Sequence, residues 1–126
     1  KAKGINAERD LVHKFWATQE WTAIRVAGSG SSRYPSPDVI AGNRLRKLAI
    51  ECKVSSEDKK YFSYDEIDQL KQYCNLFGAE PWIAIRLNRS SWHFLTLEDI
   101  EKTNNGYVIS SEIASRRGLL FEELIK

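Results

Sequence analysis

The sequence predicts an α/β fold in which a mixed central β-sheet is flanked by helices. Two segments, residues 5–20 and 63–78, carry apolar side chains at helical spacing. Strand-like stretches lie between them and continue at residues 81–87 and 91–97. The resulting order is helix, three strands, helix and two strands, with a small α/β tail. Helices that interrupt a series of strands are typical of a sheet covered by helices.

Length and composition indicate one intracellular domain spanning residues 1–126. A chain of 126 residues can bury a hydrophobic core without the support of disulfide bonds. No apolar run reaches the length of a membrane span, and the first residues, KAKGINAERD, lack a signal-peptide apolar region. Cys52 and Cys74 occupy apolar positions of predicted elements, as reduced core thiols do. We expect a cytoplasmic protein with no membrane contact.

The charge is unevenly distributed along the chain. Residues 1–60 hold 12 Lys and Arg against 7 Asp and Glu, whereas residues 61–126 hold 7 against 10. The first half is therefore +5 and the second −3, which agrees with the net charge of +2. A basic half favours a polyanionic partner such as nucleic acid. Random scatter is the alternative.

The first helix carries a carboxylate within its apolar stripe. Ile5, Val12, Phe15, Trp16 and Gln19 are predicted to share one side, with Leu11 at the border. Glu8 falls inside that stripe and needs a positive partner, because burying a lone carboxylate is costly. The alternative is a helix-edge Glu8 paired with Arg9 or Lys3.

A strand at residues 21–27 is followed by a loop that leads to a second acidic residue. Arg25 is predicted to alternate with Ile24 and to project from the opposite face. Residues 28–37, GSGSSRYPSP, have no periodicity and are expected to form a mobile surface loop. With Arg33 and Tyr34, this loop is either a cover for a nucleic-acid backbone or a solvated linker.

The segment SPDVIAGNRLRKLAIECKV, residues 36–54, predicts a β-hairpin whose register can be assigned. A connection ending at Arg46 pairs residues whose numbers sum to 89, so that Asp38 lies opposite Glu51. Alternation then gives a core face with Val39 and Ile50, and a polar face with Asp38, Glu51 and Lys53. Because opposed like charges destabilise a strand pair, a cation is expected between the two carboxylates.

Mg²⁺ fits that place, because it binds one or two carboxylates together with waters and phosphate oxygens. Lys53 reaches the same point, where its ammonium would stabilise charge on a phosphate or hold a water. The alternative is an exposed hairpin face on which Lys53 forms a screened ion pair worth less than about 1 kcal/mol.

The second half of the sequence is less informative about chemistry. Ser63 to Glu66 form a capping box, and Gly78 ends the helix. Gln69 and Tyr73 lie one turn apart on this helix and either touch the polar cluster or are ordinary surface residues. We further expect a short helix near residues 98–102, a turn at 104–106, a strand at 107–110 and a final helical stretch.

The assembled residues resemble a known nuclease superfamily. The sequence is similar to the PD-(D/E)xK nucleases in three features. These are Glu8 on the first helix, Asp38 after Pro37, and Glu51-x-Lys53 on the next strand. More closely, the sequence resembles the archaeal Holliday junction resolvases of the Hjc type. The likeness is carried by GINAERDLV, IRVAGSGSS, PDVIAG, AIECKV, FGAEPWIAIRL and SWHFLTL, and it thins beyond about residue 100.

This resemblance implies a restriction-endonuclease-like fold and a set of roles. Mg²⁺, which Mn²⁺ is expected to replace, would be bound by Asp38, Glu51 and the backbone carbonyl of Cys52, with Glu8 completing the site. Lys53 would position or activate the water. Other matching residues lie near the scissile phosphate: Ser29 as a catalytic residue, and Arg9 and Arg25 as DNA-binding residues. Arg33 is added as a DNA-binding residue from the loop.

The expected function is cleavage of four-way DNA junctions by a homodimer making paired nicks, in a protein associated with the nucleoid. Two alternatives remain open. One is a related nuclease acting on flaps, nicks or foreign duplex. The other is a non-catalytic DNA-binding module, although two carboxylates aimed at a polyanion do not favour binding. A sliding-clamp or helicase partner cannot be read from the sequence.

Overall fold

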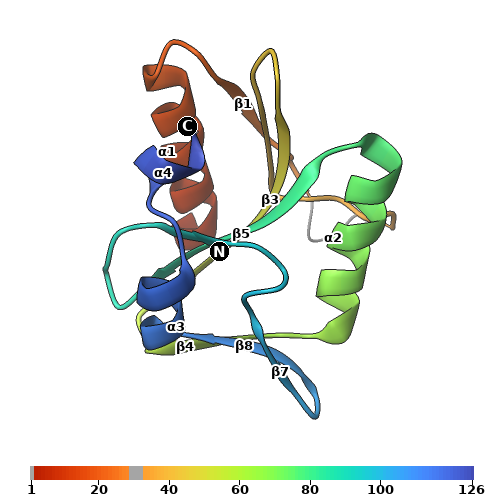
Figure 1. The fold of residues 1–126 in the computed structure, drawn as a ribbon, viewed down its shortest axis with the longest axis vertical. Helices are drawn as coiled ribbons and strands as arrows, with labels where there is room; N and C mark the ends of the chain where they lie inside the picture. The colour runs from red at the N-terminus through yellow and green to blue at the C-terminus, as the bar shows by residue number, and fades with distance from the viewer. Residues whose placement is uncertain (1, 29–32) are drawn as a thin grey trace.

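The computed structural model describes residues 2–28 and 33–126 (Figure 1). Its elements follow the order α1 (Ala2–Ala17), β1 (Thr22–Arg25), β2 (Val39–Gly42), β3 (Lys47–Ser55), β4 (Lys59–Phe62), α2 (Tyr64–Phe77), β5 (Glu80–Leu87), β6 (His93–Leu95), β7 (Glu101–Thr103), β8 (Gly106–Ser110), α3 (Ser111–Arg117) and α4 (Phe121–Leu124). None of the helices in these ranges combines the length and apolar character of a membrane span.

The central sheet is mixed, as the sequence predicts. Its strand order is β1-β2-β3-β5-β6. β3 pairs antiparallel with β2 on one side and parallel with β5 on the other. The remaining pairs, β1 with β2 and β5 with β6, are antiparallel. β3 is therefore the middle strand, and the residues on it are held by hydrogen bonds from both sides.

Both faces of the central sheet are covered. α1 and α4 pack on one face, in a cluster that contains Val39, Ile50 and Phe94. α2, α3 and the second sheet pack on the other, in a cluster that contains Ala49 and Ile83. Figure 1 shows α1 and α4 together on one side and α2 on the opposite side. The expectation of one core face and one polar face is thus wrong, because the second face is polar only near one end.

The predicted apolar stripe of the first helix is right for Phe15 and Val12 but wrong for Leu11 and Trp16. Leu11, placed at the border by the sequence analysis, is fully buried with Ala7 and Phe15. Trp16 is 53% exposed, and its indole nitrogen donates a hydrogen bond to the Ala23 carbonyl at 2.9 Å. The error arises because Trp16 is apolar over most of its surface yet lies at the helix edge, where its N–H finds a backbone acceptor.

The signals at the ends of the second helix are confirmed. Ser63 is the N-cap of α2, and Glu66 closes a capping box with it. Gly78 ends the helix in the left-handed conformation at φ 79°. Cys52 and Cys74 are both buried free thiols, as expected.

A second sheet, with strand order β4-β8-β7, was missed in part. β8 and the turn before it were expected, but β4 was not recognised, and the helix expected near residues 98–102 is a turn followed by β7. α3 was also missed. β4 pairs with β8 across some 50 residues of sequence, with Lys59 opposite Ser110, so local patterns carry little information about it.

Gly106 is the position where this second sheet permits no side chain. A Cβ added there would lie 2.1 Å from the Phe62 carbonyl oxygen, and the residue has φ 156°. We predict that Gly106→Ala lowers the free energy of unfolding by roughly 3 kcal/mol, since backbone atoms must move. Gly4→Ala is the matched control: its added Cβ meets nothing within 4 Å, and the helix should gain about 1 kcal/mol. Urea unfolding measures both, and a loss below about 1 kcal/mol in Gly106→Ala would contradict this account.

Candidate functional site

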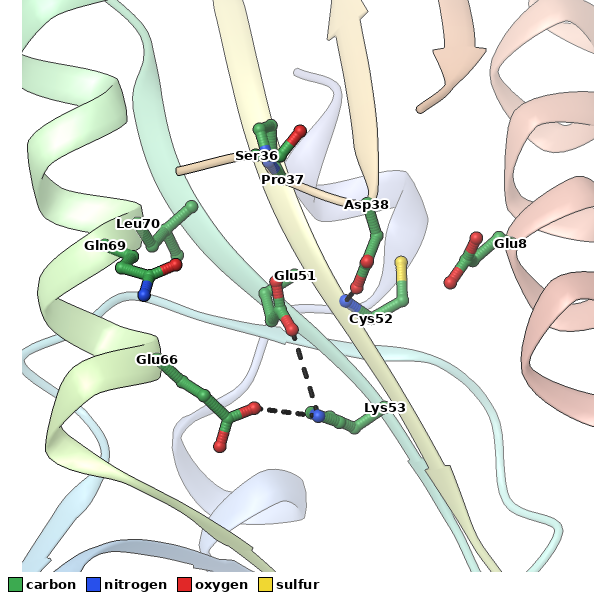
Figure 2. Close-up of a pocket in the computed structure, with 10 residues that line it drawn as sticks. All are labelled: Glu8, Ser36, Pro37, Asp38, Glu51, Cys52, Lys53, Glu66, Gln69 and Leu70. Carbon is green, nitrogen blue, oxygen red and sulfur yellow. Dashed lines mark hydrogen bonds and ion pairs between the residues drawn. The ribbon is translucent and has the colours of Figure 1, made fainter. Parts of the chain in front are cut away.

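A pocket of about 410 Å³ lies between the start of β2, the middle of β3 and the first turns of α2. Figure 2 shows its lining side chains: α1 contributes from one side and α2 from the other. The lining residues are Glu8, Ser36, Pro37, Asp38, Glu51, Cys52, Lys53, Glu66, Gln69 and Leu70. Every carboxylate that the sequence analysis assigned to the site is among them, together with Lys53 and Cys52.

The predicted hairpin register is confirmed within β2 and β3. Val39 pairs with Ile50, Ile40 with Ala49 and Ala41 with Leu48, each pair summing to 89. Asp38 does not extend this register: its backbone N–H donates to the Ile50 carbonyl at 3.0 Å, a pair whose numbers sum to 88, so the predicted pairing of Asp38 directly opposite Glu51 is wrong by one residue. Its carboxylate also accepts a hydrogen bond from the backbone N–H of Cys52 at 2.8 Å. Asp38 is therefore fixed to the backbone beside Glu51, with its side chain held against β3.

Lys53 lies between two carboxylates (Figure 2). Its ammonium is 2.9 Å from a carboxylate oxygen of Glu66 and 3.9 Å from one of Glu51. The side chain of Lys53 is 26% exposed, so this pair is less screened than an ion pair on the open surface. The cation thus contacts Glu66 more closely than the carboxylate on its own strand.

Glu8 has its positive partner across the helix–strand interface. The Arg25 guanidinium at the end of β1 lies 3.5 Å from the Glu8 carboxylate. The Glu8 side chain is only 14% exposed. The expectation that Glu8 needs a cation is confirmed, and the cation that the structure places beside it is Arg25.

Burial and mutual repulsion disfavour the charged form of two of these carboxylates. Burial raises the pKa of Glu51 to about 8, and the negative charge of Asp38 adds to the effect more than Lys53 offsets it. Burial and Asp38 likewise raise the pKa of Glu8, against the opposing effect of Arg25. The pocket consequently holds more negative charge than its own cations neutralise.

Lys53 and Glu66 are each stabilised in the charged form. Burial acts to lower the pKa of Lys53, but the hydrogen bond and charge of Glu66, with Glu51 and Asp38, together raise it. Burial acts to raise the pKa of Glu66, but hydrogen bonds from Ser63 and Lys53 lower it overall. Both groups are therefore ionised at neutral pH.

The remaining sequence-predicted residues lie outside the pocket lining. Arg9 is exposed on α1. Arg25 is half-buried and bonded to Glu8. Arg33 is exposed, and its guanidinium lies over the Tyr34 ring at 5.8 Å. Ser29 falls among residues 29–32, outside the described residues, and so does part of the loop that was expected to be mobile.

Glu66 is the pocket residue whose contribution the sequence did not reveal. The local sequence predicts Glu66 only as part of a capping box. Its second role follows from the position of α2 relative to β3, which no local pattern encodes. Gln69, which was considered for this cluster, does line the pocket, whereas Tyr73 lies one turn further along α2.

The donor chemistry of the pocket fits a hard divalent cation. Asp38 and Glu51 supply carboxylate oxygens to the pocket, and they lie close enough for the charge of Asp38 to raise the pKa of Glu51. Within residues 2–28 and 33–126, no three Asp, Glu, His or Cys side chains gather into a complete metal cage. An incomplete protein cage suits Mg²⁺, which commonly keeps several waters and shares phosphate oxygens with its substrate.

The sequence profile of the archaeal Holliday junction resolvase family, Hjc, matches residues 1–126. This chain belongs to the archaeal Holliday junction resolvase family. Its relatives include the crossover junction endodeoxyribonuclease Hjc of Archaeoglobus fulgidus, 41% identical over 98% of this chain and 95% of the relative. The enzyme of the same name from Methanocaldococcus jannaschii is 32% identical over 88% and 78% of the two chains.

A solved structure agrees with this assignment. The Holliday junction resolvase Hjc of Archaeoglobus fulgidus superposes with a TM-score of 0.88 at 39% identity, covering 95% of this chain and 96% of the other. The fold of this Holliday junction resolvase family member is therefore a mixed α/β nuclease fold, as the sequence resemblance implied.

The raised pKa of Glu51 leads to a stability prediction for the metal-free protein. Between the ordinary value of 4.5 and about 8, the unfolded carboxylate ionises while the folded one resists, so stability falls as the pH rises through this window. In EDTA, Glu51→Gln should be more stable than wild type at pH 8 by roughly 2 kcal/mol, or about 5 °C in Tm, after allowance for solvent. At pH 4 the two should agree.

Thermal melts at both pH values measure this difference. Glu20→Gln, an exposed carboxylate outside the pocket, is the control and should leave the pH profile unchanged. Added Mg²⁺ should raise the Tm of wild type more than that of Glu51→Gln, because a ligand stabilises the state that binds it. Equal pH profiles for wild type and Glu51→Gln would contradict the assignment of unbalanced charge to this pocket.

Proposed function

We propose that this protein is a structure-selective endonuclease that resolves four-way DNA junctions by Mg²⁺-dependent phosphodiester hydrolysis, with residues 1–126 acting as one nuclease domain. The observation that carries the proposal is the gathering of Asp38, Glu51 and Lys53 in the lining of one pocket. The family membership supports the substrate class. Acting on chromosomal junctions, the protein would be found with the nucleoid.

In this proposal Asp38, Glu51 and the backbone carbonyl of Cys52 hold Mg²⁺, with Glu8 completing the acidic site. The bound cation supplies Lewis-acid polarisation of the phosphate and lowers the pKa of water. Mn²⁺ should substitute, because it accepts the same oxygen ligands. The hydrogen bond from the Cys52 N–H keeps the Asp38 carboxylate oriented against β3.

The other residues of the chain bind and orient the substrate. The Lys53 ammonium faces the pocket and is placed to hold a water or to stabilise charge on the attacked phosphate. Arg25 neutralises Glu8, which reduces repulsion of an incoming phosphate. Arg9 and Arg33 are exposed cations for the DNA backbone, and Ser29 is proposed to act near the scissile phosphate.

Two rival functions are distinguishable by experiment. A nuclease specific for flaps, nicks or foreign duplex would share the same carboxylates and lysine. Cleavage of a four-way junction and a matched duplex at equal concentration separates the two, and equal rates would contradict junction selectivity. A non-catalytic DNA-binding module would leave DNA uncut in Mg²⁺, whereas the proposed enzyme cuts in Mg²⁺ and stops in EDTA.

The protein is further proposed to act as a homodimer. A junction has two equivalent cleavage points, so two sites related by a two-fold axis match it. A shallow apolar surface, here called the α2 face, is lined by Tyr34, Pro35, Tyr73, Leu76 and Phe77. Leu76 is 83% exposed and Tyr34 is 71% exposed. Since α2 also lines the pocket, pairing through this face would bring two pockets close to one axis.

Catalytic variants should separate cutting from binding. We predict that Asp38→Asn and Glu51→Gln each abolish Mg²⁺-dependent cleavage, while the junction Kd in EDTA stays the same or improves, since a negative charge near phosphate is removed. Lys53→Ala should lose on the order of 10²-fold or more. Single-turnover cleavage and gel-shift titration measure these effects. Substantial cutting by either carboxylate variant would show that its carboxylate is not a metal ligand.

The dimer proposal predicts that Leu76→Glu is monomeric in sedimentation at concentrations where wild type is dimeric, because a charge in an apolar interface is costly. Leu45→Glu is the matched control, since Leu45 is 91% exposed at the tip of the β2–β3 hairpin and should leave the dimer intact. On a cruciform plasmid, Leu76→Glu should give nicked circles in place of linear product. Dimeric Leu76→Glu, or a monomer that yields linear product, would overturn the assigned face.

A further inference from the structure

The carboxylate of Glu66 divides its two oxygens between a helix terminus and the site lysine. One oxygen accepts the backbone N–H of Ser63 at 2.9 Å, which closes the capping box of α2. The other lies 2.9 Å from the Lys53 ammonium. Figure 2 shows Glu66 reaching from α2 toward Lys53 on β3. The contact therefore joins an anchored helix start to a strand residue.

The capping role alone does not require a charge at this position. In a capping box the third helical residue accepts from the N-cap N–H, and Gln performs this as Glu does. An amide at residue 66 would cap α2 but would leave the Lys53 ammonium without its nearest anion. The full negative charge suits the positive end of the helix dipole, but it is Lys53 that needs it as its nearest anion.

The alternative partner for Lys53 is the carboxylate required by the reaction. Glu51 is the next anion, with an oxygen 3.9 Å from the ammonium. A lysine side chain has several rotatable bonds, so without Glu66 the ammonium can close the remaining gap to Glu51. That closure would move the cation from its working place and occupy a carboxylate oxygen intended for Mg²⁺.

We propose that Glu66 is the positioning residue for Lys53, holding the ammonium from the α2 side and keeping it off Glu51. This inference rests on the proposed nuclease function and adds a residue to it. Glu66 touches neither water nor phosphate in this role and acts through Lys53. Because its other oxygen is fixed by the Ser63 N–H, the carboxylate has little freedom to swing away, which makes the contact a rigid support.

The first test compares Glu66→Gln with Ser63→Ala. Glu66→Gln retains a capping acceptor but removes the charge, whereas Ser63→Ala removes the hydroxyl that accepts from the Glu66 N–H at 3.0 Å and leaves the carboxylate. Single-turnover junction cleavage of Glu66→Gln should fall about 10- to 100-fold, while its junction Kd in EDTA stays the same or improves. Ser63→Ala should lower Tm and cut within about three-fold of wild type. A wild-type rate for Glu66→Gln, or equal losses in both variants, would overturn the proposal.

The second test is a double-mutant cycle with Lys53→Ala. If Glu66 acts through Lys53, the double variant Lys53→Ala/Glu66→Gln should cut at the residual rate of Lys53→Ala alone. If Glu66→Gln slows the Lys53→Ala enzyme by the same factor as it slows wild type, Glu66 acts independently of the lysine. That result would overturn the positioning role in favour of a direct one.

The third test needs neither metal nor DNA. In NMR spectra of the free protein, the two protons on the Cε of Lys53 should have distinct shifts when the ammonium is held. They should merge in Glu66→Gln and stay distinct in Ser63→Ala. Merged protons in wild type would overturn the proposal. If wild type fails to cut junctions, the proposed function fails, yet these spectra still report on the Lys53–Glu66 contact.

Discussion

The antiparallel register between β2 and β3 decides where each charged group of the pocket lies. With Val39 opposite Ile50, Asp38 at the start of β2 lies beside the middle of β3, where Glu51 and Lys53 share one face of the strand. A slip of one residue would turn Glu51 and Lys53 toward the cluster beneath α1. The buried side chains Val39 and Ile50 prevent that slip, because it would bring them to the polar end of the opposite face. Apolar packing on one face thus fixes the polar geometry on the other.

The charged groups of the pocket lower the free energy of unfolding of the metal-free protein. Burial and neighbouring charge raise the pKa values of Glu51 and Glu8, so their ionised forms weaken the fold. The two cations nearest the pocket are each committed to one partner, Arg25 to Glu8 and Lys53 chiefly to Glu66. Glu51 and Asp38 consequently keep a field that favours a divalent cation. Active sites commonly hold such local strain, supported by the surrounding fold.

The sequence was most informative where a constraint is local. Hairpin pairing within β2 and β3, the Ser63–Glu66 capping box and Gly78 each depend on a few adjacent residues, and all three were predicted correctly. The need of Glu8 for a cation was also correctly inferred from burial, but Arg25 lies 17 residues away and the pairing appears only in three dimensions.

Predictions failed where distant segments meet. β4 is a short strand whose pairing partner, β8, lies some 50 residues away, and its residues have no strong alternation to mark it. Trp16 and Leu11 exchanged places because hydrophobicity alone does not report which side of a helix the sheet occupies. For the same reason Glu66 was recognised as a capping residue but not as a partner of Lys53. Neither the sequence of α2 nor that of β3 reports where α2 lies over the sheet.

Because β3 is the middle strand of the sheet, its pairing decides the order in which the site residues come together during folding. Hairpin β2–β3 contains only neighbouring residues and can form early, whereas pairing with β5 joins Glu51 to Ile83, across 32 residues. Contacts of such separation form late because loop closure must precede them. Asp38 and Glu51 therefore come together while the other edge of β3 is still unpaired. Because α2 lies between β3 and β5 in the sequence, Glu66 reaches Lys53 only when β5 pairs with β3. A chain emerging from the ribosome therefore carries its nuclease residues unassembled until synthesis has passed Leu87.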